Sequence, residues 1–184
     1  ASAISQRNGV WVKTSDDRRY LGTIRTTETA GQTAIDREGG FVGIWNVDNR
    51  QPIYPFILMD EGEYTYATLA WRPTFNVSTY RIQLISGMPQ PIQVTGSLRV
   101  QAASIHAVGV GLNKTNANDA IFFGNGAGTS TDTMIVEARL IGDVSEGFNF
   151  YQLLEYGDTT ANAVIKGFSD PVSGTSGILA EWYY

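Results

Sequence analysis

Acidic side chains are the first candidates for chemistry in this sequence. The run D-E-G-E places Asp60, Glu61 and Glu63 close together. Hydrolysis of a glycosidic bond uses two carboxyl groups about 5 to 9 Å apart, one as acid and the other as base or nucleophile. These residues could supply such a pair, but a short acidic run around a glycine is also typical of a solvated turn. We favour the turn and predict no catalytic residue.

His106 is the only histidine and therefore the only candidate for a serine–histidine–acid triad. It lies in S-I-H-A-V-G, among residues typical of a strand. The chain contains no G-x-S-x-G sequence, the turn that exposes the nucleophilic serine in many hydrolases. The pattern indicates a structural histidine with its hydrogen bonds satisfied.

Metal and phosphate sites also find little support. The T-N-A-N-D run at 115–119 is rich in oxygen ligands but lacks the residue order and terminal glutamate of a calcium loop. The G-N-G-A-G segment at 124–128 lacks the lysine of a phosphate-binding loop and opens no helix, which favours a flexible turn. With no cysteine, thiolate ligands and disulfides are excluded. We predict neither a metal nor a cofactor.

The elements that must position these residues are short strands. Apolar and polar residues alternate along 92–101 and again along 64–71 and 134–141, which is the period of a half-buried strand. About a dozen such runs occur at intervals of about 8 to 15 residues, with turn residues between them and no amphipathic helix. We therefore predict an all-β fold, an antiparallel β-sandwich of jelly-roll-like type. Two prolines place the run 51–59 at a sheet edge or in an extended crossover.

Domain organisation follows from the ends of this pattern. Residues 1–9 are small and polar and predict a short flexible N-terminal arm. No linker divides residues 10–184, so they are expected to form a single β-sandwich domain. The first residues also lack the basic and apolar regions of a signal peptide.

The charge distribution argues against two classes of partner. The chain has 13 Lys and Arg against 18 Asp and Glu, a net charge of −5, and its cations are scattered. Nucleic acid is not expected as a partner, because phosphate binding needs clustered positive charge. A membrane is not expected either, since no apolar run approaches the roughly 20 residues needed to span a bilayer.

Aromatic residues are the most informative surface candidates. Neighbouring residues of a strand point to opposite faces, so the aromatic residues of 64–71 and 182–184 cannot all enter one core. Exposed rings beside Asn and Arg suit sugar stacking or a subunit interface, and we favour the interface. The predicted subunit or receptor contacts are Trp45, Asn46, Asn49, Arg50, Tyr64, Tyr66, Trp71, Trp182, Tyr183 and Tyr184.

Four motifs occur in an order that resembles virion proteins of tailed bacteriophages. They are Y-L-G-T-I-R-T-T at 20–27, W-N-x-x-N-R at 45–50, Y-T-Y-A-T-L-A-W-R at 64–72 and G-V-G-L at 109–112. The resemblance covers about residues 18–115. It implies a structural component of the virion, such as a capsid decoration, head-fibre or tail-fibre domain, commonly a trimer.

The expected function is therefore that of a non-enzymatic virion protein. Homo-oligomers of this kind usually form closed rings, and we favour a trimer. Other virion proteins are expected as partners, and a host-surface glycan is a further candidate. The alternative is a glycan-binding or glycan-degrading module, a lectin or glycoside hydrolase, with Asp60, Glu61 and Glu63 as its acids. A soluble cellular lectin-like protein is a third, weaker hypothesis.

Overall fold

The computed structural model describes most of the chain, and nearly all of the regular secondary structure in the described residues is β-strand. The described residues are 4–7, 10–14, 20–27, 32–47, 51–59, 62–101, 106–120, 122–123, 125–126, 133–157, 163–166 and 176–183. They form four sheets and one short 3-10 segment, η1 (Thr74–Asn76). The predicted all-β sandwich is confirmed, whereas its jelly-roll connectivity stays a prediction.

One large sheet contains seven strands, and we call it the seven-stranded sheet. Its pairings are antiparallel except that between β5 and β11, which is parallel. In spatial order the strands are β15 (Asn125–Gly126), β13 (His106–Leu112), β17 (Gly147–Tyr156), β11 (Arg81–Ser86), β5 (Phe41–Val42) and β4 (Ile35–Asp36), with β10 (Trp71–Pro73) also paired to β17.

The other large sheet contains eight strands, and we call it the eight-stranded sheet. It is built on β12, which pairs along its whole length with β16 on one side. On its other side β12 pairs first with β19 and then with β18. The strands are β14 (Phe122–Phe123), β16 (Thr133–Val144), β12 (Gln90–Gln101), β18 (Ala163–Lys166), β9 (Glu63–Tyr66), β19 (Gly177–Tyr183), β7 (Pro52–Ile53) and β8 (Phe56–Leu58).

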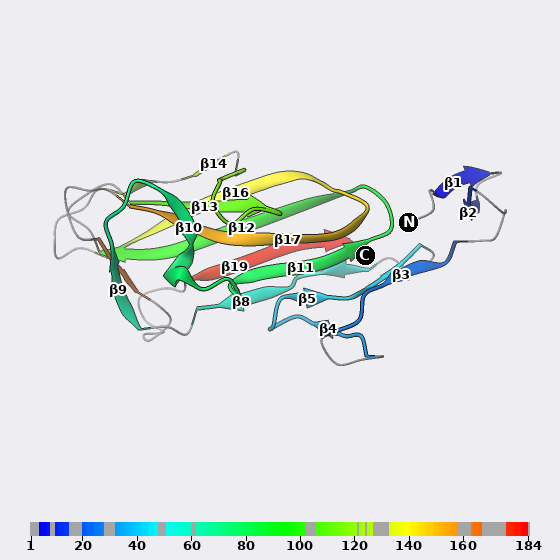
Figure 1. Ribbon diagram of the computed structural model, residues 1–184, viewed down its shortest axis with the longest axis horizontal. Coiled ribbons are helices and arrows are strands. Elements are labelled where there is room, and N and C mark those ends of the chain that lie inside the picture. Colours follow the sequence, from blue (N-terminus) through cyan, green and yellow to red (C-terminus); the bar gives the residue numbers. More distant parts are fainter. Residues whose placement is uncertain are drawn as a thin grey trace.

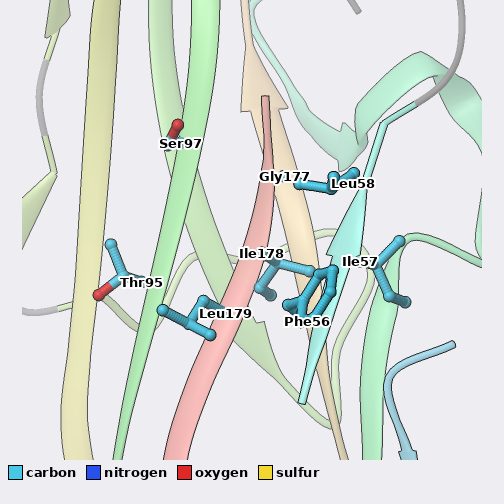
Figure 2. Close-up of a pocket in the computed structure, with 8 residues that line it drawn as sticks. All are labelled: Phe56, Ile57, Leu58, Thr95, Ser97, Gly177, Ile178 and Leu179. Atoms are coloured by element: carbon cyan, nitrogen blue, oxygen red, sulfur yellow. The ribbon is translucent and has the colours of Figure 1, made fainter. Parts of the chain in front are cut away.

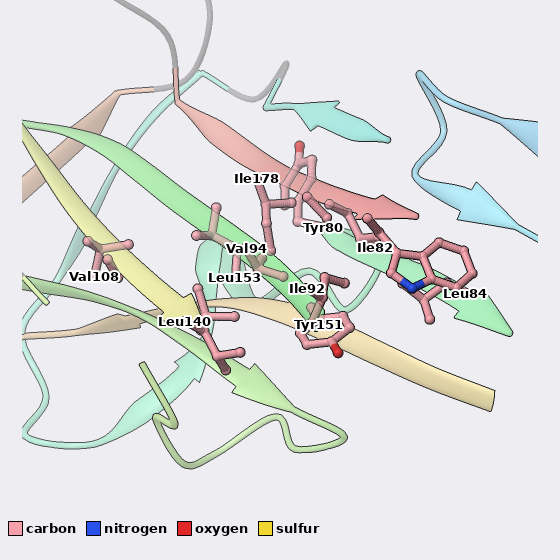
Figure 3. Packing of buried hydrophobic residues seen from close by; sticks show 14 of the residues in the cluster. Tyr80, Ile82, Leu84, Ile92, Val94, Val108, Leu140, Tyr151, Leu153 and Ile178 are labelled. Carbon is pink, nitrogen blue, oxygen red and sulfur yellow. The ribbon is translucent and has the colours of Figure 1, made fainter. Parts of the chain in front are cut away.

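The two large sheets stack face to face along the length of the molecule (Figure 1). Their inner faces share one apolar core, and Figure 3 shows residues of both sheets in it. In β12 the inward residues Ile92, Val94, Leu98 and Val100 are all buried, as the alternation predicted. Gly96 is a further inward position, where an added Cβ would lie 2.5 Å from the Leu153 side chain of the opposite sheet.

Proline places β7 and β8 at an edge, as predicted. Pro55 lies in the break between the two strands, and among the described strands both pair only with β19. Because proline lacks a backbone N–H, an edge strand interrupted by proline offers an incomplete template to further strands.

The prediction of one continuous strand over residues 64–71 is wrong. The chain leaves the eight-stranded sheet after Tyr66 and joins the seven-stranded sheet at Trp71. Between them the Tyr66 hydroxyl donates a hydrogen bond to the Ala70 carbonyl, 2.8 Å away. Residues 67–70 are all exposed and the chain bends there, so the alternation of the sequence is not matched by alternate burial across this crossing.

Two small sheets lie outside the sandwich. One is the antiparallel pair of β3 (Gly22–Ile24) and β6 (Ile44–Asn46). The strands β1 (Ile4–Arg7) and β2 (Val10–Lys13) form a hairpin set apart from the large sheets (Figure 1). The predicted flexible arm over residues 1–9 is therefore a strand at Ile4–Arg7, and the expected boundary at residue 10 lies within this hairpin.

Candidate functional site

A pair of ionisable side chains lies at one end of the sandwich, just after the chain crosses from β9 of one sheet to β10 of the other. Arg72 is opposite Glu155 in the β10–β17 register, and its Nε donates to Glu155 Oε1 at 2.6 Å. The Glu155 side chain is completely buried. The Arg72 guanidinium also lies 3.7 Å from the centroid of the Tyr66 ring, a cation–π contact. Ring and carboxylate together hold the guanidinium in one position.

His106 belongs to the same interior region. The inward face of β13 continues from Val108 to His106, and the imidazole is fully buried. Burial, with the charge of Arg72 in addition, lowers the pKa of His106 to about 4, so the imidazole is neutral at physiological pH. Neither ring nitrogen has a hydrogen-bond partner among the described residues. The prediction of a structural histidine is confirmed for its burial, but not for satisfied hydrogen bonds.

The carboxyl group of Glu155 is perturbed in the opposite sense. Burial raises its pKa to about 9, and the backbone N–H of Phe75 acts against this shift. A raised pKa of this kind can mark a general acid. Neither Glu155 nor His106 has exposed surface, so a substrate in solution cannot touch either group in this conformation. The arrangement is one of internal packing and pairing.

The acidic run of the sequence lies at the start of β9. Asp60 and Glu61 are outside the described residues. Glu63 is exposed and opposes Lys166 in the β9–β18 register. The described residues therefore do not show whether the carboxylates of this run form a catalytic pair.

The oxygen-rich run at 115–119 serves the fold. Asn118 Oδ1 accepts hydrogen bonds from the backbone N–H groups of Val110 and Ala120, at 3.0 and 2.9 Å. The Asp119 carboxylate accepts from the Leu112 N–H and from Lys114 Nζ. These oxygens hold the loop against the edge of β13. Among the described residues no group of three or more His, Asp or Glu could hold a metal ion.

Three of the residues predicted to contact a subunit or receptor are buried, so the prediction is wrong for them. Trp45 and Trp182 are 1% and 0% exposed, and Tyr66 is buried as well. Trp45 stacks on the Tyr20 ring with centroids 5.8 Å apart, which shields it from solvent. Trp182 pairs with Ile92 and Ile53 within the sheet and points into the core. Their aromatic character reflects core packing, because large rings fill the space between sheets.

The other predicted contacts are partly available or lie outside the described residues. Tyr64 and Trp71 are half-buried; the first ring packs on Phe75 and the second on Tyr156. Asn46 is exposed at the end of β6. Tyr183 opposes Pro52 in the β19–β7 register. Asn49, Arg50 and Tyr184 lie outside the described residues.

The outer face of the eight-stranded sheet carries exposed apolar residues. Leu58, Ile135, Ile141 and Leu179 are each exposed on β8, β16 or β19. A shallow groove of about 320 Å³ lies over β8, β19 and β12, lined in part by Phe56, Leu58 and Leu179 (Figure 2). We call this surface the apolar face, defined by Leu58, Phe56, Ile135, Ile141 and Leu179.

A polar pocket of about 360 Å³ lies beside the outer face of the seven-stranded sheet. It contains Arg25 and Arg81, and burial together with the nearby charge of Arg81 lowers the pKa of Arg25. Both guanidiniums lie over rings of β17: Arg25 is 3.2 Å from the Phe148 centroid and Arg81 is 5.0 Å from that of Phe150. We call it the arginine pocket, and its lining residues are Arg25, Thr26, Thr27, Ala34, Asp36, Phe41, Arg81 and Gln83.

Sequence reasoning missed the arginine pocket. Arg81 occupies an outward position of its strand, which the alternation of 79–85 predicts. No periodicity joins it to Arg25, which precedes it by 56 positions. The sequence offers one indirect signal. With 13 Lys and Arg in 184 residues, two arginines in one pocket are not expected by chance.

These features define a mainly antiparallel all-β sandwich with a cluster of largely buried ionisable side chains, an apolar outer face and a cationic pocket. No protein-family model matches the chain, and no curated protein matches it. Among the described residues, no helix has the length and apolar character to cross a membrane.

Proposed function

We propose that this chain is a non-enzymatic structural protein of a bacteriophage virion, a capsid decoration or fibre component that assembles as a homo-oligomer. The observation that carries the proposal is the apolar face of the eight-stranded sheet. The order of the four motifs within residues 18–115, which resembles phage virion proteins, supports the same assignment.

The apolar face is built by the pairing of three neighbouring strands. Thr95 of β12 lies between Arg139 of β16 and Leu179 of β19 in the register. Gln93, the next residue of β12 on the same face, lies between Ile141 of β16 and Glu181 of β19. Leucine and isoleucine thus stand among both neutral and charged polar side chains. Subunit interfaces combine an apolar centre with polar surroundings in this way.

A second copy of the chain is the partner that this face suits. Glu137 and Arg139 occupy neighbouring outward positions of β16, so each copy supplies charges of both signs. An arrangement in which one copy's cation meets another copy's carboxylate needs no other protein. We favour a trimer, with other virion proteins as partners beyond the homo-oligomer and a host-surface glycan as a candidate ligand.

The proposal is tested by sedimentation of the purified protein with one variant in the face. Leu179 is 44% exposed, and Leu179→Arg places a charge in the proposed interface. We expect wild type to sediment as an oligomer at micromolar concentration and Leu179→Arg to shift toward monomer, because burial of an unpaired charge is costly. Leu69→Arg is the matched control, since Leu69 is 56% exposed in the crossing between the sheets.

Binding to purified phage particles tests the location separately. Labelled wild type should bind particles depleted of this protein, and imaging should place it on the head or the tail. A wild-type monomer at micromolar concentration that also fails to bind particles would contradict the proposal.

A further inference from the structure

The two guanidiniums of the arginine pocket have polar atoms without partners. Arg25 Nη1 and Arg81 Nε are both buried, and neither has a hydrogen-bond partner among the described residues. No ion pair is formed by either side chain within the described part of the chain. Buried donors of this kind are normally satisfied, and leaving one unsatisfied is unfavourable. Both side chains also line the pocket, where a ligand with acceptor oxygens can approach their accessible N–H groups.

The rings of β17 hold these cations in place without using their donors. A guanidinium stacked on an aromatic face directs its N–H groups outward along its own plane. Phe148 and Phe150 lie with centroids 6.4 Å apart and carry Arg25 and Arg81 respectively. The two positive groups are therefore presented together, in a chain whose net charge is −5. Such a pair is suited to an anionic group, and planar guanidinium binds planar carboxylate through two parallel hydrogen bonds.

The remaining lining residues suit hydroxyl groups rather than a bare anion. Thr26, Thr27 and Gln83 offer donors and acceptors, and the Phe41 ring offers an apolar face. Asp36 adds a carboxylate, whose Oδ1 is held by the Gly39 N–H at 2.8 Å. A carboxylate in a site for a simple anion would be unfavourable, whereas it is a good acceptor for a sugar hydroxyl. The cavity volume of about 360 Å³ also falls within the range for small-molecule sites.

We infer that the arginine pocket binds a carboxylate-bearing sugar, such as a uronic acid residue. In this arrangement Arg25 and Arg81 bind the carboxylate, Asp36 and Gln83 bind hydroxyl groups, and Phe41 contacts the ring. The inference does not depend on the virion assignment, because it rests on the chemistry of the pocket alone.

Ligand-observed NMR titration of the full chain tests the sugar class. Glucuronic acid is the probe, glucose is its neutral counterpart, and glucose 6-phosphate carries the charge on a phosphate instead. We expect glucuronic acid to bind at least about tenfold more tightly than glucose, because two charge-assisted contacts are lost with the neutral sugar. Equal binding of acid and neutral sugar, absence of glucuronic acid binding, or tighter binding of the phosphate would each overturn the inference.

Variants of the pocket test the residues. Arg25→Gln and Arg81→Gln should each weaken glucuronic acid binding about tenfold. Arg37→Gln is the matched control, because it removes the same charge from an exposed position in the neighbouring turn and should leave binding unchanged. Arg81→Lys keeps the charge but loses the planar guanidinium group, so it should also weaken glucuronic acid binding. This variant tests the role of Arg81 if Arg81→Gln does not fold. Unchanged binding in the arginine variants, or an equal loss in Arg37→Gln, would overturn the assignment.

Discussion

Single buried ionisable residues at one end of the sandwich determine how this protein responds to acid. The pKa of His106 is about 4 in the folded chain and 6.5 when the imidazole is exposed. As the pH falls through 6.5, the unfolded chain takes up a proton that the folded chain resists. Stability conferred by the neutral imidazole is therefore present above pH 6.5 and lost between pH 6.5 and about 4.

The variant His106→Gln should remove this acid dependence. As the pH falls across the window, we expect the unfolding free energy of wild type to drop relative to that of the variant by up to about 3 kcal/mol. Denaturant unfolding at a series of pH values measures both. Glu155, with a pKa raised from 4.5 to about 9, acts in the opposite direction as the pH falls, so only the difference between the two proteins reports the imidazole. Parallel pH profiles would show that His106 does not contribute.

The contact between Arg72 and Glu155 should contribute to the stability of the folded chain. Arg72→Met keeps the length of the side chain but leaves the buried carboxyl without its donor. We expect a loss of about 2 kcal/mol, below the value for a fully buried pair because the Arg72 side chain is 29% exposed.

A double-mutant cycle separates the pair from its surroundings. Glu155→Gln retains an acceptor at the same place and removes the charge, so the double variant should be more stable than the sum of the two single losses predicts. Additive losses, measured by denaturant unfolding, would mean that the 2.6 Å contact contributes nothing.

At the scale of elements, the loop after β13 completes the edge of the seven-stranded sheet. The Asp119 N–H donates to the Val110 carbonyl at 2.8 Å, and the Asn118 side chain accepts from the Val110 N–H. The loop thus occupies backbone groups of β13 that another strand could otherwise pair with. Covering an edge in this way protects a sheet from unwanted pairing.

Asn118→Ala should expose this edge. Two backbone N–H groups lose their acceptor, which we expect to cost about 1 to 3 kcal/mol and to increase hydrogen exchange at Val110. Asn116→Ala is the control, since Asn116 is exposed in the same loop. Thermal unfolding and amide exchange measure both effects, and equal behaviour of the two variants would contradict the role of Asn118.

At the scale of the whole molecule, core packing and assembly involve different residues. Trp45 packs against Tyr20 and Gly87, where a Cβ on the glycine would lie 2.5 Å from the indole ring. Trp45→Ala should therefore lower the unfolding free energy by about 3 to 5 kcal/mol. The oligomeric state at a temperature where the variant is folded should not change. Calorimetry measures the stability and sedimentation measures the oligomeric state of the same samples. If Trp45 instead contacted a partner, the substitution would weaken assembly and leave the unfolding free energy unchanged.

Strand character was readable from the sequence because it depends on neighbouring residues. The period of two is a property of the extended chain, so the inward residues of β12, such as Val94 and Leu98, could be predicted from local alternation. Proline at 52 and 55 excluded a central position for the same local reason, the missing N–H.

Only the tertiary structure decided which sheet each strand joins and which outward faces stay exposed. Alternation continued unbroken from Tyr64 to Trp71 although the chain changes sheets between them. It also gave no indication that Trp45 and Trp182 would be covered, or that Arg25 and Arg81 would share one pocket. The physical reason is that these contacts join residues far apart in the chain. They depend on how the sheets pair and stack, which a local pattern does not specify.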